Sequence, residues 1–183
     1  MATLINLNGP PGIGKSAIAR RYVDEHPGVL NCDIDVLRTL IGGWSNDFAV
    51  AGALIRPAAL SMIEAYLASG HDVVLPQMFV DPDELSRFQA SATRAGALFV
   101  ERFLMDDVEQ AVARFGRRGE GGPHDPWHEH VRAIVASNGG EPELIRFHAG
   151  LLRLLEQRPQ AVVITSTEGA ADDTYEQLLA SLP

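Results

Sequence analysis

Lysine is almost absent from this chain of 183 residues, which carries one lysine against 14 arginines. Cysteine is equally scarce: Cys32 is the only one, so no disulfide can form within the chain, which fits a reducing compartment. No uncharged apolar run reaches the ~20 residues that a membrane-spanning helix needs, and the first strand-like run begins at residue 2, leaving no room for a signal peptide. We therefore expect a cytoplasmic protein without a membrane partner.

The chain is also poor in positive charge, with a formal net charge of −9. Proteins that bind nucleic acid along a broad surface need a basic face, so we expect no nucleic-acid partner. A nucleotide is still compatible, because a phosphate site is local. The length and the hydrophobic content of 46% suit one soluble domain over residues 1–183, and the sequence does not set the oligomeric state.

The single lysine stands where a phosphate-binding loop requires one. The motif G-x-x-x-x-G-K-[ST] is complete, and we expect its residues and the next one to bind a nucleotide: Gly9, Pro10, Pro11, Gly12, Ile13, Gly14, Lys15, Ser16 and Ala17. A lysine ammonium is a compact charge on a flexible stem and can reach the β- and γ-phosphates, so we expect Lys15 to act in catalysis. The hydroxyl of Ser16 would bind Mg²⁺.

The surroundings of the motif favour this interpretation over an ordinary glycine-rich turn. Residues 2–8 are rich in Leu, Ile and Thr and predict a buried strand. After the loop, Ile18, Ala19, Tyr22 and Val23 recur at helical spacing until Pro27-Gly28. A strand, a glycine loop and a helix in this order present backbone N–H groups and a helix N-terminus to phosphate.

Strands and helices alternate along the rest of the chain. We expect further strands over residues 28–33, 71–75, 97–104 and 160–165, with helices between them. In the long helical stretch between Asn46 and Ser69 we expect a kink or a break at Arg56-Pro57. Alternation of this kind predicts a parallel five-stranded sheet covered by helices on both faces, a three-layer α/β/α fold. Ligands of such sheets bind beyond the carboxyl ends of the strands.

Two aspartates follow the second expected strand, in the sequence Asp33-Ile34-Asp35, and Arg38 comes one turn later. One carboxylate of such a pair caps the next helix and the other is available for chemistry, and the sequence leaves open which does which. We assign Asp35 as the base that takes the proton of a hydroxyl, and Asp33 as the metal-binding or supporting acid. Arg38 would bind an anionic part of the substrate, or would only pair with an acid.

Arg114, Arg117 and Arg118 lie three and four residues apart, on one face of an expected helix, and a glycine-rich stretch follows over residues 119–123. We interpret residues 114–127 as a lid whose arginines stabilise the phosphate charge during transfer. These arginines have no acid partner at the right spacing on their own helix. The alternative is a solvated basic face at a helix C-terminus.

His124, His128 and His130 lie close in sequence but fit no zinc spacing, so polar lid residues are the favoured interpretation. His148 falls on a leucine stripe and is expected to be a core or boundary residue, and Trp44, Met78 and Phe79 could line a pocket or belong to the core. The third strand ends in Pro76-Gln77, where a motor ATPase would carry a Walker B acid, and no guanine-specific N-K-x-D motif is present. The lack of a Walker B acid favours phosphoryl transfer to a small acceptor molecule. Gln77 is a candidate for substrate binding.

On these residues, the chain resembles the P-loop kinase superfamily. Within it, the chain is similar to the small AAA-type "domain 33" ATP-binding proteins, a branch akin to chloramphenicol phosphotransferase, zeta toxins, adenylylsulfate kinase and the gluconate and shikimate kinases. The resemblance rests on Gly9–Ser16, on Asp33–Arg38 and, weakly, on Arg114–Arg118. The single Asp of chloramphenicol phosphotransferase matches Asp35, whereas Pro76-Gln77 departs from the pattern.

The resemblance implies a five-stranded sheet, ATP with Mg²⁺, a lid and a carboxylate base for an acceptor hydroxyl. We therefore expect an ATP-dependent phosphotransferase that acts on a small molecule, a metabolite or an antibiotic. Two alternatives stay open. One is a zeta-toxin-like kinase of a nucleotide sugar, and the other is a nucleotide-binding ATPase or regulator without an acceptor.

Overall fold

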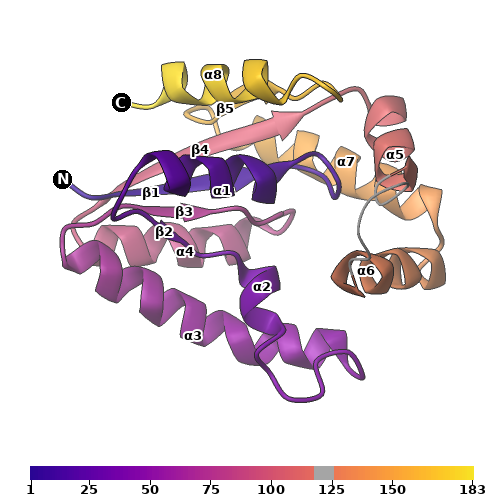
Figure 1. The fold of residues 1–183 in the computed structure, drawn as a ribbon, viewed down its shortest axis with the longest axis horizontal. Helices are drawn as coiled ribbons and strands as arrows, with labels where there is room; N and C mark the ends of the chain where they lie inside the picture. Colours follow the sequence, from indigo (N-terminus) through magenta and orange to yellow (C-terminus); the bar gives the residue numbers. More distant parts are fainter. Residues whose placement is uncertain (118–125) are drawn as a thin grey trace.

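A five-stranded parallel sheet forms the centre of the computed structural model, which describes residues 1–117 and 126–183 (Figure 1). The strands are β1 (Thr3–Asn8), β2 (Leu30–Asn31), β3 (Val73–Leu75), β4 (Leu98–Met105) and β5 (Val162–Thr165). Their order across the sheet is β2-β3-β1-β4-β5, and each neighbouring pair is parallel. Since β1 lies between β3 and β4, the strand order reverses there, and a ligand site is expected beyond its carboxyl end.

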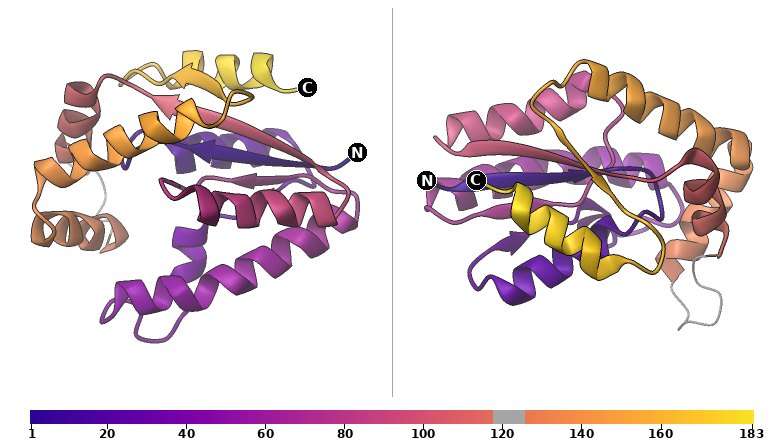
Figure 2. Two further views of the ribbon diagram at one scale, coloured as in Figure 1. Left: turned by 180° about the vertical axis from the view of Figure 1, so that it is seen from behind. Right: turned by 90° about the horizontal axis from the view of Figure 1, so that it is seen from above.

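Helices connect the strands in the described part of the chain. They are α1 (Lys15–Glu25), α2 (Ile34–Arg38), α3 (Phe48–Ala68), α4 (Pro82–Arg94), α5 (Val108–Arg117), α6 (Pro126–Ser137), α7 (Glu141–Glu156) and α8 (Ala171–Ser181). Figure 2 shows α5 and α6 beyond the same end of the sheet as the loop before α1. The alternation expected from the sequence is therefore confirmed.

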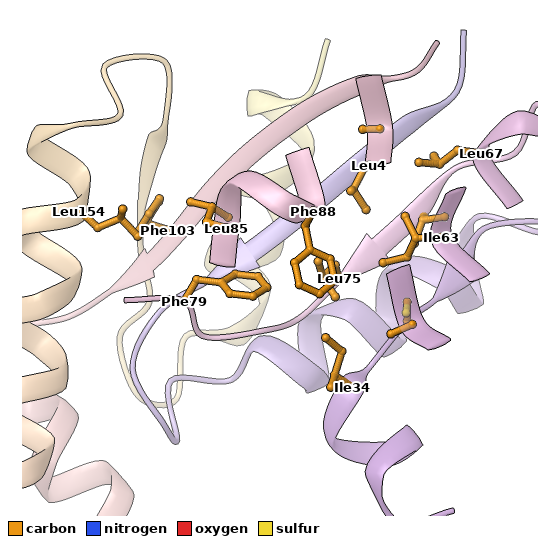
Figure 3. Packing of buried hydrophobic residues seen from close by; sticks show 14 of the residues in the cluster. Leu4, Ile34, Ile63, Leu67, Leu75, Phe79, Leu85, Phe88, Phe103 and Leu154 are labelled. Atoms are coloured by element: carbon orange, nitrogen blue, oxygen red, sulfur yellow. The ribbon is translucent and has the colours of Figure 1, made fainter. Parts of the chain in front are cut away.

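Two hydrophobic clusters cover the two faces of the sheet. On one face, Leu4, Leu75 and Phe103 pack with residues of α3, α4 and α7, as Figure 3 shows for Ile63, Phe88 and Leu154 among others. On the other face, Leu7 and Val74 pack with residues of α1 and α8. Because side chains alternate along a strand, each buried strand feeds both clusters, and this produces the three-layer α/β/α fold.

The helix does not break at Arg56-Pro57, because α3 runs through Pro57 as one helix; a kink there stays a prediction. Five of its six buried residues recur every four positions, at Ala51, Ile55, Ala59, Ile63 and Leu67. Packing of this stripe on both sides of the proline offsets the one backbone hydrogen bond that proline removes.

By length and mean hydropathy alone, α3 could also cross a membrane. In this structure one side of α3 packs within the protein. Its stripe belongs to the cluster on the sheet, and Arg56 and Glu64 pair with Glu84 and Arg94 of α4.

Candidate active site

The loop of residues 9–14 has the backbone shape that its glycines predict. Gly9, Gly12 and Gly14 have φ values of 145°, 82° and 104°, a region that other residues rarely adopt. A Cβ atom on Gly9 would lie 2.3 Å from the carbonyl oxygen of Leu104, so no side chain fits there. Lys15 begins α1, and its Nζ donates to the carbonyl oxygens of Gly9 and Pro10 at 2.8 and 2.9 Å.

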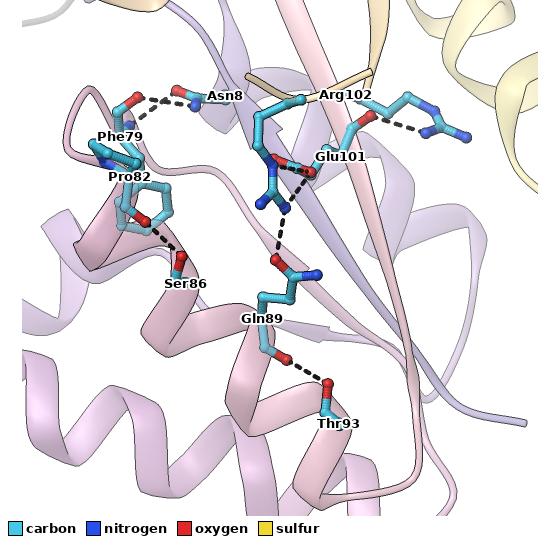
Figure 4. A network of polar contacts seen from close by, with 9 residues as sticks. Asn8, Phe79, Pro82, Ser86, Gln89, Thr93, Glu101 and Arg102 are labelled. Atoms are coloured by element: carbon cyan, nitrogen blue, oxygen red, sulfur yellow. Dashed lines mark hydrogen bonds and ion pairs between the residues drawn. The ribbon is translucent and has the colours of Figure 1, made fainter. Parts of the chain in front are cut away.

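Polar side chains at the ends of β1 and β5 fix this loop. Oδ1 of Asn8 accepts from the backbone N–H groups of Gly9 and Phe79, and its Nδ2 donates to the carbonyl oxygen of Phe79 (Figure 4). On the other side, the hydroxyl of Ser166, which follows β5, donates to the carbonyl oxygen of Ile13 at 2.9 Å. The loop is therefore held before any ligand binds, as preorganised binding requires.

A cavity of about 540 Å³ lies over this loop. Nine of its lining residues were candidates from the sequence: Pro11, Gly12, Gly14, Lys15, Ser16, Ala17, Asp33, Asp35 and Arg114. The structure thus brings the phosphate loop, the acidic pair and one arginine of α5 together around one space. The other candidates do not line this cavity: Gly9, Pro10, Ile13, Arg38, Gln77 and Arg117. Arg118 lies outside the described residues.

The sequence left open whether Asp33 or Asp35 caps the next helix, and in the structure Asp33 is the cap. Asp33 is the N-cap of α2, and its Oδ1 accepts from the backbone N–H groups of Asp35 and Val36 at 3.0 and 3.4 Å. Asp35 lies in the first turn of that helix, where 39% of its side-chain surface is exposed. Asp35 is therefore the carboxylate that does not cap the helix. The metal-binding role of Asp33 stays a prediction.

The surroundings of Asp35 favour its protonated form. Removal of water by the surrounding protein is the main cause that raises the pKa of Asp35 above its ordinary value of 3.8, and the nearby charge of Asp33 adds to the rise. Arg38 and Lys15 act in the opposite direction. A carboxyl group with a raised pKa is a stronger base once it is deprotonated, which suits a group that accepts a proton.

Arg38 is nearly buried beside Asp35. Only 5% of its side-chain surface is exposed, and its Nη2 lies 3.7 Å from Oδ1 of Asp35. The guanidinium lies over the ring of Phe48, 3.8 Å from the ring centroid, in a cation–π contact. Arg38 therefore holds the helix that carries Asp35 against the start of α3. Its role in substrate binding stays a prediction.

Arg114 and Arg117 of α5 have partners, and these partners lie outside their own helix. Nη1 of Arg114 donates to the carbonyl oxygen of Ser166 at 2.8 Å, and Arg117 forms an ion pair with Glu168. A Cβ atom on Gly14 would lie 3.1 Å from Nη2 of Arg114, so this guanidinium sits directly on the phosphate loop. Both partners come from the segment after β5, about 50 residues away, and helix spacing could not reveal them.

The histidines take different positions. His128 of α6 is buried and lines the cavity against the ring of Phe115, so it is a site residue that sequence reasoning missed. His130 contacts the rings of Trp44 and Phe48 instead. His148 is buried, with Nε2 2.9 Å from the carbonyl oxygen of Asp106, which confirms the core interpretation. His124 and most of the expected lid lie outside the described residues.

No group of three acidic, histidine or cysteine side chains that could hold a metal occurs in residues 1–117 and 126–183. Pro76 lines the cavity at the end of β3, so this end supplies no carboxylate to the cavity wall. Ser16 and Asp33 do line it. This donor set fits Mg²⁺, which binds nucleotides through few protein oxygens and keeps several waters, and does not fit a metal held by the protein alone.

Residues 4–137, about three quarters of the chain, match the family model AAA_33, described as an AAA domain. No curated protein matches the chain. Among solved structures, a protein of Chloroflexus aurantiacus described as "a putative kinase" is similar over 100% of this chain and 99% of its own, with a TM-score of 0.63 and 17% identity. A gluconokinase of Sinorhizobium meliloti is similar over 98% and 90%, with a TM-score of 0.58 and 16% identity.

At these identities the two structures are evidence for the fold alone. The family match, the phosphate loop and the shared fold agree with one another. The chain therefore belongs to the AAA_33 family, within the P-loop kinase superfamily.

Proposed function

We propose that this protein is an ATP-dependent kinase that transfers the γ-phosphate to a hydroxyl of a small molecule. The observation that carries the proposal is that Lys15 and Asp35 line one cavity while Asp33 is engaged as a helix cap. A cavity of about 540 Å³ lies within the usual range for small-molecule sites. The gluconokinase among the similar structures is itself a kinase of a small molecule.

In the proposed reaction, Asp35 accepts the proton of the acceptor hydroxyl while that oxygen forms a bond to the γ-phosphorus. The bond between the γ-phosphorus and the β–γ bridging oxygen breaks, and ADP leaves. Lys15 and Arg114 neutralise the phosphate charge, since both already lie on the loop without nucleotide. Mg²⁺, when bound by Ser16 and Asp33 with the nucleotide, would supply further neutralisation of that charge.

The direct test is transfer of labelled γ-phosphate from ATP to hydroxyl compounds, measured beside release of labelled phosphate into water. The proposal expects a phosphorylated product whose formation exceeds hydrolysis in the presence of the right acceptor. Lys15→Ala is the matched control, because it removes the phosphate contact and leaves Asp35 in place. Hydrolysis that no acceptor changes would instead favour an ATPase or regulator without an acceptor.

A further inference from the structure

Two arginine side chains lie next to each other near Asp35, although they carry the same charge. Arg38 follows Asp35 in α2, and Arg56 belongs to α3. A Cβ atom on Gly52 would lie 2.9 Å from Nη1 of Arg56 and 3.1 Å from Nη2 of Arg38, so both guanidinium groups contact the same part of α3. Glycine within a helix is unfavourable relative to alanine. The space that the two guanidinium groups occupy is a physical reason for a glycine at this buried position.

A carboxylate faces each of the two arginines. Nη2 of Arg38 lies 3.7 Å from Oδ1 of Asp35, and Arg56 forms an ion pair with Glu84 in the first turn of α4. The side chains of Arg56 and Glu84 are 31% and 25% exposed, so water screens their charges only in part. Asp35, Arg38, Arg56 and Glu84 therefore form a charged row that connects the cavity wall to α4, with the negative groups at its two ends.

The charge of Glu84 also acts on Arg38. Burial is the main cause that lowers the pKa of Arg38 below its ordinary value, and the positive charge of Arg56 adds to the fall. Asp35 and Glu84 both oppose it. The two carboxylates at the ends of the charged row together stabilise the arginines between them.

The contact between Arg38 and Asp35 balances charge without occupying the carboxylate. A separation of 3.7 Å is longer than a hydrogen bond, and the side-chain oxygens of Asp35 accept no hydrogen bond from the residues that the structure describes. They are therefore open to the proton of an acceptor hydroxyl. The ring of Phe48 holds Arg38 by a cation–π contact, and Glu84 holds Arg56.

We propose that Glu84 is a positioning residue for phosphoryl transfer, because its pair with Arg56 keeps that arginine away from the carboxylate of Asp35. Without the charge of Glu84, Asp35 would be the one carboxylate left in the charged row. Arg56 would displace Arg38 and bind Asp35, and a guanidinium bound closely to both carboxylate oxygens would occupy the atoms that must accept the proton. This inference rests on the proposed kinase function.

The first experiment measures kcat for ADP release from ATP, with Mg²⁺ and the hydroxyl compound that the wild-type protein phosphorylates. Glu84→Gln should lower kcat about 10- to 100-fold, the scale of a small misplacement at a reacting group. It should change the KM for ATP by less than about twofold, because the phosphate loop is untouched. The double variant Arg56→Gln/Glu84→Gln should regain kcat to within about threefold of wild type, since no second arginine then competes for Asp35.

An ion pair that only joins α3 to α4 predicts a different result, and two further variants separate the alternatives. Glu64→Gln is the matched control, because Glu64 of α3 pairs with Arg94 of α4 and neither residue lines the cavity; kcat should stay unchanged. Gly52→Ala places a methyl group against the ends of Arg38 and Arg56 rather than against backbone. It should lower kcat without lowering the melting temperature, which also verifies that each variant is folded.

A measurement without substrate reports the position of Arg38 directly. Its guanidinium lies 3.8 Å from the ring centroid of Phe48, so the ring shields its protons and displaces their NMR signals from the usual arginine position. The Nε–Hε signal is assigned by its loss in Arg38→Lys. It should move in Glu84→Gln and return to its wild-type position in Arg56→Gln/Glu84→Gln.

Three results would each overturn the inference: wild-type kcat in Glu84→Gln, a double variant no faster than Glu84→Gln, or an Arg38 signal that stays in place in Glu84→Gln. Failure of the kinase function is recognised separately. Wild-type protein that binds a non-hydrolysable ATP analogue and transfers phosphate to no compound would contradict the proposed function itself, whereas the Arg38 signal would still show whether Glu84 holds the charged row.

Discussion

Oδ1 of Asp33 accepts a hydrogen bond from the backbone N–H of Asp35 at 3.0 Å, so one carboxylate of the acidic pair holds the other in position. The cap fixes the first turn of α2 and directs Asp35 to the cavity wall. Asp33→Ala should therefore lower stability by about 0.5–2 kcal/mol, the usual cost of losing an N-cap. Urea unfolding measures this cost. Asp81→Ala removes the cap of α4 at a residue that does not line the cavity and is the matched control for capping alone. Unchanged stability in Asp33→Ala would contradict the assignment of Asp33 as the cap.

Lys15→Ala should reduce turnover by about 10²–10³-fold, the usual cost of removing one preorganised electrostatic donor. The chain has no other lysine to take its place. Steady-state ADP release measures the effect, with circular dichroism to verify the fold. Turnover within twofold of wild type would remove the phosphate loop from the mechanism.

Replacement of Arg114 and replacement of Arg117, both in α5, should affect catalysis differently. Arg114 sits on the phosphate loop, whereas Arg117 and Glu168 form a pair in which both side chains are 49% exposed. We therefore expect Arg114→Ala to lower kcat by about 10²-fold or more. Arg117→Ala should change stability by less than about 1 kcal/mol, because exposed ion pairs contribute little.

The test is to measure kcat of Arg114→Ala and of Arg117→Ala at saturating ATP. A larger loss of kcat in Arg117→Ala than in Arg114→Ala would reverse the roles assigned to the two arginines. Glu168→Gln, which removes only the partner of Arg117, reports how much of any loss comes from the pair.

Gly9→Ala should destabilise the protein by several kcal/mol, since the new Cβ would meet the backbone carbonyl of Leu104 and the φ of 145° would be strained. Gly42 is a suitable control, because it has no positive φ and a Cβ added there would meet no atom within 4 Å. Thermal melting of Gly9→Ala and Gly42→Ala compares the two sites. Equal melting temperatures would contradict the close approach at Gly9.

Local sequence signals predicted the parallel sheet and the phosphate loop, but not the partners of the other site residues. The phosphate loop was predictable because the glycines, Lys15 and Ser16 act within eight residues, and the parallel sheet follows from the alternation of strands and helices. Which aspartate caps α2 was not predictable, because both have suitable spacing and the choice depends on the backbone dihedrals of Asp33. The partners of Arg114 and Arg117 are more than 50 residues away, and the burial of His128 depends on its contact with Phe115.

The central claim, that Asp35 is the base of a phosphoryl transfer, is tested most directly by Asp35→Asn across a range of pH. Wild-type kcat/KM should rise with pH through the pKa of Asp35 in the free enzyme, because only the deprotonated carboxylate accepts a proton, and this acid limb should lie above pH 3.8. Asp35→Asn should bind a non-hydrolysable ATP analogue as wild type does, transfer phosphate about 10²–10⁴-fold more slowly, and lose the acid limb. Full transfer by Asp35→Asn with the acid limb retained, together with an inactive Asp33→Asn, would contradict the claim and assign the base to Asp33.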